Sequence, residues 1–253
     1  MRRLVPSAIF FLALLSFPAA ASDAAMSYAQ CVALVKQNPA LAEERAHAWQ
    51  NVGGGPAAVH CSALALTALK RYAEAGRKLD ALAHDRAITS LNNRATLFDE
   101  AGNAWMLANL PNNAVQSFSS ALAETPNAVE ALSDRARARA MLRDWNGADS
   151  DLSAALVQDQ NRADLLVLRA SARHALGHKT EAAIDLLRAL SLYPNYPAAL
   201  VERGTMKYEA GDQNGARADW KKAAASPGGG EAAETAKRYL AQLGPEARPA
   251  TVK

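Results

Sequence analysis

Three segments of the chain read GADSDLSAAL (147–156), EAAIDLLRAL (181–190) and GARADWKKAA (215–224), and each starts 34 residues after the one before it. An alanine and an aspartate recur at this interval, as Ala148, Ala182 and Ala216 and as Asp151, Asp185 and Asp219. A strict period in this range is typical of stacked helical hairpins, because a single hairpin cannot bury its apolar face alone.

The same register divides the chain into four contiguous units, 95–128, 129–162, 163–196 and 197–230. Position 24 of the units is bulky, and positions 8, 20 and 27 are small. The bulky residues are Phe118, Leu152, Leu186 and Trp220. The small ones are Gly102, Ala114, Ala121, Ala136, Ala148, Ala155, Ala170, Ala182, Ala189, Gly204, Ala216 and Ala223. We expect two closely packed antiparallel helices in each unit, with the turn at positions 15 and 16.

These small and bulky positions, together with Pro126 and Pro194 near the ends of two units, resemble the tetratricopeptide repeat (TPR). The resemblance runs from residue 95 to residue 230 without an insertion. It implies an all-α fold, a right-handed α-solenoid of stacked helix-turn-helix units. The abundance of alanine and leucine, both good helix formers, favours the same fold class.

The register continues beyond these four units in both directions. Upstream, residues 56–94 form a TPR-like unit after a slip of five residues, and residues 22–55 predict a degenerate helical hairpin. Downstream, residues 231–243 predict a capping helix, as the open end of a stack requires. Residues 244–253 predict a disordered tail.

The first 21 residues have the layout of a secretory signal peptide, with Arg2 and Arg3, an apolar run and small residues at Ala19 and Ala21. An uncleaved anchor is the alternative, but the apolar run is shorter than a membrane-spanning helix needs. We therefore expect an exported protein, located in the periplasm and free of the membrane after cleavage.

Two cysteines, Cys31 and Cys61, are present, and an even number in an exported chain favours a disulfide over two buried thiols. The leader carries two of the 28 basic side chains, so the mature chain has 26 against 25 acidic ones. A nearly neutral chain gives no support to a nucleic-acid partner.

The recurring aspartate at position 23 is accompanied by an arginine at position 7 of the same unit: Arg135 with Asp151, Arg169 with Asp185 and Arg203 with Asp219. Unit 95–128 lacks both, because Ala101 and Ser117 replace them. This joint occurrence predicts structural ion pairs, since buried charges are tolerated when paired. The alternative is an acidic ladder for a metal or a cationic ligand.

A second basic column follows at position 11, as Arg139, Arg173 and Lys207. For these residues we expect apolar stems on the surface with charged heads in water. The alternative is a basic stripe for an acidic peptide.

Catalytic signatures are missing from the sequence: it has no phosphate-binding glycine loop, no G-x-S-x-G and no Cys-x-x-Cys. His174 and His178 have the spacing of two metal ligands on a helix, but His178 falls at an expected turn. The sequence predicts no catalytic residue, no cofactor and no metal site, and hence a protein that is not an enzyme.

The TPR resemblance implies that the first helices of the units line a concave groove for a protein or peptide partner. Carried over position by position, the groove residues are Asp99, Asn103, Met106, Glu130, Arg137, Asp164, Ser171, His174, Thr205 and Tyr208. TPR proteins that clamp a carboxylate have Lys where Asp99 stands, so this ligand is not indicated. An accessory subunit of an envelope enzyme complex, or a small-ligand or metal site near His174, are alternatives.

Overall fold

The computed structural model describes residues 26–244, and this part of the chain consists of thirteen α-helices without strands. The helices are α1 (Tyr28–Gln37), α2 (Pro39–Asn51), α3 (Gly55–Ala68), α4 (Tyr72–Ala83), α5 (Leu91–Leu107), α6 (Pro111–Glu124), α7 (Val129–Met141), α8 (Trp145–Gln158), α9 (Ala163–Ala175), α10 (Lys179–Leu192), α11 (Pro197–Glu209), α12 (Gln213–Ala224) and α13 (Gly230–Leu243).

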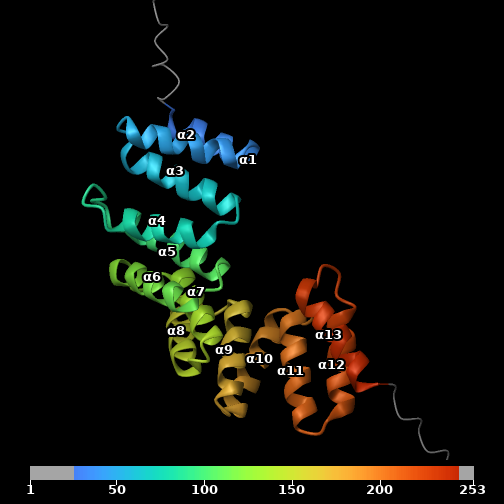
Figure 1. The fold of residues 1–253 in the computed structure, drawn as a ribbon. Helices are drawn as coiled ribbons and strands as arrows, with labels where there is room; N and C mark the ends of the chain where they lie inside the picture. The colour runs from blue at the N-terminus through green and yellow to red at the C-terminus, as the bar shows by residue number, and fades with distance from the viewer. Residues whose placement is uncertain (1–25, 245–253) are drawn as a thin grey trace, which may run out of the picture.

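Each helix packs mainly against its neighbours in sequence, and the hairpins stack one after another into an α-solenoid. The two ends of the array lie far apart, and the stack bends at α7 to α9 (Figure 1). The last helix, α13, packs on both α11 and α12 and covers the end of the stack. The fold class expected from the repeat is confirmed.

The turn between the two helices of each unit has a left-handed residue at position 15. These residues are Asn109, Arg143, Gly177 and Gly211, with φ of 58°, 59°, 83° and 86°. Such a residue ends a helix by turning the chain out of it, and glycine adopts this conformation without steric cost. After two of these turns, the side chains of Asp144 and Asp212 cap the next helix by accepting the N–H of Gly147 and Gly215.

Positions 8 and 24 face each other across the hairpin, which explains why one is small where the other is bulky. A Cβ on Gly204 would lie 2.5 Å from Nε1 of Trp220, and a Cβ on Gly102 would lie 2.5 Å from Cε1 of Phe118. The units with leucine at position 24 have room for alanine at position 8 instead. Side-chain size at one position thus determines the largest residue that fits at the other.

The predicted disulfide between Cys31 and Cys61 is present, with 6.1 Å between the two Cα atoms. Both cysteines are buried, and the bond joins α1 to α3. It holds the first hairpin, whose own core is small, to the next one. On the chain-entropy model a closed loop of 30 residues contributes about 3 to 4 kcal/mol.

The predicted signal peptide, residues 1–21, lies outside the described residues, and so does the predicted tail apart from Gly244. Within residues 26–244, no helix has the length and apolar character needed to span a bilayer.

Candidate protein-binding groove

Each aspartate at position 23 is held by the arginine at position 7 of its own unit through two hydrogen bonds. Nε and Nη2 of Arg135 donate to the two carboxylate oxygens of Asp151 at 2.9 and 2.7 Å. The distances are 2.9 and 2.7 Å for Arg169 with Asp185, and 2.8 and 2.6 Å for Arg203 with Asp219. The three aspartates are at most 5% exposed, so these contacts lie inside the hairpins.

The second basic column joins the same carboxylates, so the expectation that its charged heads lie in water is wrong. Arg139, Arg173 and Lys207 each donate to the Oδ2 of the aspartate in their unit at 2.8 Å. Position 11 lies one turn after position 7 on the first helix, which brings both cations to one carboxylate. With two cations on each aspartate, the column supports neither an acidic ladder nor a basic stripe.

The pKa of Asp219 reflects this pairing. Burial alone would raise it, but the hydrogen bonds from Arg203 and Lys207 outweigh burial and hold the pKa below its ordinary value.

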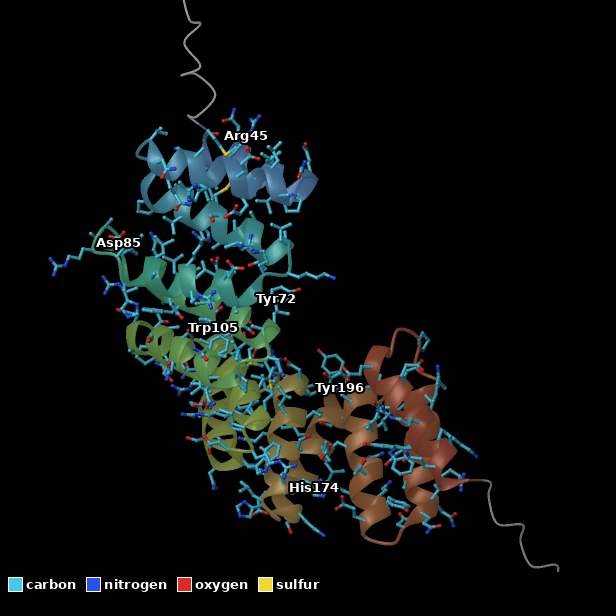
Figure 2. All side chains as sticks on the ribbon, in the orientation of Figure 1. Arg45, Tyr72, Asp85, Trp105, His174 and Tyr196 are labelled. Atoms are coloured by element: carbon cyan, nitrogen blue, oxygen red, sulfur yellow. A yellow bond between two sulfur atoms is a disulfide. The ribbon has the colours of Figure 1, made fainter. Side chains whose placement is uncertain are left out.

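Unit 95–128, which lacks this ion pair, has another polar cluster at the same place. Oγ of Ser117 and Nε1 of Trp105 both donate to the carboxylate of Asp80 at 2.7 Å. Asp80 comes from α4 of the preceding unit, so this cluster connects two units (Figure 2 labels Trp105).

At the start of the groove, Asn103 donates from Nδ2 to the backbone oxygen and to Oδ2 of Asp99, at 3.1 and 3.3 Å. Burial, followed by the negative charges of Asp134, Glu100 and Glu130, raises the pKa of Asp99 to about 6.

The next groove residues are connected by Arg162, a residue that the sequence did not single out. Its Nη1 donates to Glu130 at 2.7 Å, and its Nε and Nη2 donate to both oxygens of Asp164 at 3.0 and 2.9 Å. These hydrogen bonds, with that to Asp164 largest, raise the pKa of Arg162 and lower that of Asp164. Arg162 therefore joins the groove residues of α7 and α9.

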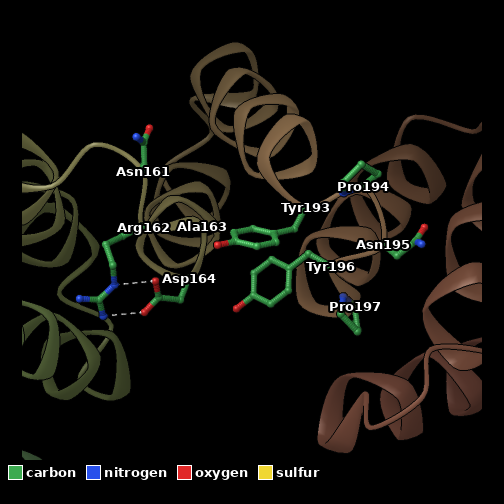
Figure 3. Close-up of a pocket in the computed structure, with 9 residues that line it drawn as sticks. All are labelled: Asn161, Arg162, Ala163, Asp164, Tyr193, Pro194, Asn195, Tyr196 and Pro197. Atoms are coloured by element: carbon green, nitrogen blue, oxygen red, sulfur yellow. Dashed lines mark hydrogen bonds and ion pairs between the residues drawn. The ribbon is translucent and has the colours of Figure 1, made fainter.

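Beside this pair lies an open cleft of about 660 Å³, formed where the α8–α9 and α10–α11 loops meet. Figure 3 shows the rings of Tyr193 and Tyr196 beside the Arg162–Asp164 pair. The two ring centroids are 6.4 Å apart, and the ring planes are inclined by 58°. Tyr193 is 59% exposed. Burial and the charge of Asp164 raise the pKa of Tyr196, while Arg137 opposes this shift. Arg137 also pairs with Asp134 on its own helix.

His174 lies apart from this cleft and connects α9 to α11 (Figure 2). Its Nδ1 lies 3.1 Å from Glu202 Oε1, and its Nε2 lies 2.8 Å from Glu209 Oε2. Burial alone would lower the pKa of His174, but the hydrogen bonds to Glu209 and Glu202 outweigh burial and raise it. Among the described residues, no group of three histidine, cysteine or acidic side chains is arranged to hold a metal ion.

The remaining predicted groove residues are dispersed. Thr205 and Tyr208 line a separate cleft of about 210 Å³ against α13, where Tyr208 packs on Trp220 at 5.8 Å between ring centroids. Met106 packs against the core, and Ser171 is half-buried outside the clefts named here. The ten predicted residues therefore do not form one continuous site.

Solved structures share the fold of this chain at low sequence identity. The C-terminal part of a TPR repeat-containing protein from Cytophaga hutchinsonii is 16% identical, with a TM-score of 0.64 over 86% of this chain and 87% of its own. MamA from Desulfovibrio magneticus RS-1, residues 41 to the end, is 17% identical, with a TM-score of 0.59 over 66% of this chain and 92% of its own. The chain has the fold of a TPR solenoid. No family model and no curated protein matches its sequence.

In this TPR solenoid, the cleft of about 660 Å³ beside Tyr193 and Tyr196, called the aromatic cleft below, is built from residues in the loops and at the helix ends. The helix positions carried over from the TPR resemblance do not include most of them. Arg162 and Tyr196 both occupy position 34, immediately before the first helix of the next unit, and they are the N-cap residues of α9 and α11. Tyr193 is the C-cap of α10. The sequence signal that could have found them is the segment YPNYP (193–197), because two tyrosines in a short loop are typical of contact surfaces.

Proposed function

We propose that the protein is a non-catalytic protein–protein interaction scaffold of the bacterial cell envelope, and that it binds a peptide or protein segment in the concave groove. The proposal rests on one observation above all, the open cleft of about 660 Å³ between the Arg162–Asp164 pair and the rings of Tyr193 and Tyr196. Tyrosine and arginine are enriched among the residues that dominate the binding energy of interfaces.

The shape and composition of this cleft favour a macromolecular segment over a small substrate. It is open, and proline and tyrosine side chains supply much of its wall. The apolar rings would bury the body of a side chain, while the exposed ends of Arg162 and Asp164 would orient its polar groups. Small-molecule sites are more enclosed.

The location in the cell envelope is supported by the disulfide and by the leader-like sequence. A disulfide between buried cysteines is typical of proteins in oxidising compartments. An accessory or assembly subunit of an envelope enzyme complex would use the same groove, and the identity of the captured partner distinguishes it from a general scaffold. We propose no metal site at His174, because its two carboxylate neighbours already engage both ring nitrogens.

The experiment is site-specific photo-crosslinking in the native cell envelope. A photo-crosslinking amino acid replaces Asn195, which is exposed in the cleft, and in a second strain it replaces Ile184, which is 59% exposed on α10. We expect a discrete crosslinked band from position 195 and none from position 184. Mass spectrometry then identifies the partner.

A Tyr193→Ala substitution in the crosslinking strain provides the specificity control. Removing this exposed ring should weaken the crosslink from position 195 without lowering the amount of protein. Crosslinks from position 184 alone would place the contact on the outer surface and contradict binding in the groove.

A further inference from the structure

Two kinds of aspartate are removed from water, fully or in part, in this protein: the buried Asp151, Asp185 and Asp219, and the half-buried Asp99. Asp151, Asp185 and Asp219 each have two cations within hydrogen-bonding distance. Asp99 has the side-chain amide of Asn103 and no cation within ion-pair distance among the described residues, and its Oδ1 is buried without a hydrogen-bond partner. An unpaired carboxylate held in the fold is unfavourable, so its persistence in a groove points to a role in binding.

The surroundings of Asp99 are themselves acidic. Glu100 follows it on α5, and Glu130 and Asp134 approach it from α7, and all three disfavour its charged form. Arg162 and Arg137 are the nearby cations, but they are bonded to Glu130 and Asp134 and do not reach Asp99. The groove between α5 and α7 thus presents negative charge to whatever enters it.

A cleft of about 310 Å³ lies between these two helices, and both Asp99 and Glu130 line it. The rest of its wall is made of alanine and threonine side chains. The small residues give this slot a largely apolar surface, with a carboxylate beside it. A lysine or arginine side chain has the matching form, an aliphatic stem with a cation at its end.

One contact connects a wall residue of this slot with a wall residue of the aromatic cleft. Glu130 lines the slot, and Arg162, to which it is bonded, lines the cleft with Tyr193 and Tyr196. Arg162 also shows how a guanidinium is held in this groove, since it fits between the carboxylates of Glu130 and Asp164.

We propose that the partner segment is basic, and that one of its lysine or arginine side chains enters the slot between α5 and α7 and pairs with Asp99. This inference rests on the proposed function, because it specifies the chemistry of the segment that the groove binds. The adjoining part of the segment then passes Arg162 and packs on Tyr193 and Tyr196. Charge complementarity of this kind gives specificity to a groove that is otherwise built from small residues.

The test is selection from a phage-displayed library of random twelve-residue peptides against three purified proteins: the wild type, Asp99→Asn and Asp85→Asn. Asn is nearly isosteric with Asp, so the substitution removes the charge with little change in shape. Asp85 lies in the α4–α5 loop, on the other side of the molecule from Tyr196 (Figure 2), and provides a matched control. Affinities of the enriched peptides are then measured by fluorescence anisotropy.

We expect the wild type and Asp85→Asn to enrich peptides rich in lysine and arginine. The best of these should bind Asp99→Asn at least about tenfold more weakly, and a peptide with glutamine in place of its basic residues should lose affinity for the wild type alike. The enriched peptides are also tested against Tyr193→Ala. Neutral or acidic peptides that bind the wild type but not Tyr193→Ala would overturn the basic partner while leaving the groove as the binding site. If no enriched peptide requires Tyr193 or Asp99 for binding, both proposals are overturned.

Discussion

Arg169 and Asp185, sixteen residues apart on the two helices of one hairpin, form a two-point contact in which Nε and Nη2 each face one carboxylate oxygen. The arginine side chain is 17% exposed and the aspartate side chain 4%, so the pair is largely removed from water. Arg173 donates a third hydrogen bond to the carboxylate of Asp185. The pair therefore fixes α9 against α10 with defined geometry as well as charge.

Removing the carboxylate of this pair should destabilise the protein strongly. Asp185→Asn leaves Arg169 without its counter-charge in a largely buried place, and it leaves Arg173 with only the carboxylate of Asp149. We expect a loss of about 3 kcal/mol in the free energy of unfolding. Urea unfolding followed by circular dichroism measures it. The matched control, Asp159→Asn at the exposed end of α8, should change the free energy by less than about 0.5 kcal/mol. Equal effects of the two substitutions would contradict a structural role for the pair.

The size relation between positions 8 and 24 predicts a rescue. Gly204→Ala places a Cβ against the ring of Trp220 and should lower the stability by about 1 to 3 kcal/mol. Adding Trp220→Leu restores the combination found in units 129–162 and 163–196, so the double variant should be more stable than the sum of the two single changes predicts. A double-mutant cycle of thermal unfolding measures this coupling, and strict additivity would refute the relation.

The environment of Asp99 predicts a pH-dependent gain of stability on substitution. The pKa of Asp99 in the folded chain is about 6, above its ordinary value of 3.8, so the folded state loses stability as pH rises between these values. Asp99→Asn removes this loss. We expect the variant to be more stable than the wild type at pH 8, on the order of 1 to 2 kcal/mol, and equal to it near pH 3.5. Urea unfolding at both pH values checks this, and a variant less stable at pH 8 would contradict it.

His174 predicts the opposite pH window. Its pKa is raised in the folded chain, so the contact of the imidazolium with Glu202 and Glu209 contributes fully below the ordinary pKa of 6.5 and is lost as pH rises through the folded value. His174→Gln should therefore lower the thermal midpoint at pH 5.5 and change it little at pH 9. The effect corresponds to about 1 kcal/mol or less, because Glu209 is exposed. His178→Gln, at an exposed turn, is the control and should shift neither midpoint.

Loss of the disulfide should act on the first hairpin. In the Cys31→Ser/Cys61→Ser double variant we expect faster hydrogen exchange of the amides in α1 and α2, and a loss of up to about 3 to 4 kcal/mol. The amides of α9 to α12 should exchange as before, because each unit of a solenoid contacts only its neighbours. Unchanged exchange in α1 and α2 would show that packing alone holds this hairpin.

The turns and the binding clefts differ in how far the sequence reveals them. Position 15 could be placed as a turn because Gly177 and Gly211 occupy it in two units, although the other two units have Asn109 and Arg143 in the same left-handed conformation. The cleft at Tyr193 and Tyr196 could not be placed, because its residues lie in loops outside the periodic helix positions.

The sequence by itself determined the features that recur along the repeats: the period of 34, the small and bulky positions, and the pairing of Arg169 with Asp185 and its equivalents in three of the units. The link between Cys31 and Cys61 was predicted separately, from the even number of cysteines. The recurring features repeat because each unit packs against a near copy of itself, so the same packing requirement applies at the same position of each unit. The arginine at position 7 and the aspartate at position 23 are present together or absent together, so their pairing can be predicted from the sequence alone.

Only the tertiary structure decided where the second basic column points and how the groove is charged. Arg139 lies near Asp151 because of the angle between two helices, and the spacing in the sequence does not state that angle. Burial, followed by the negative charges of Asp134, Glu100 and Glu130, raises the pKa of Asp99. Arg162 reaches Glu130 across 32 residues. These interactions depend on distances through space between units of different sequence, and such distances are set by the way the hairpins stack.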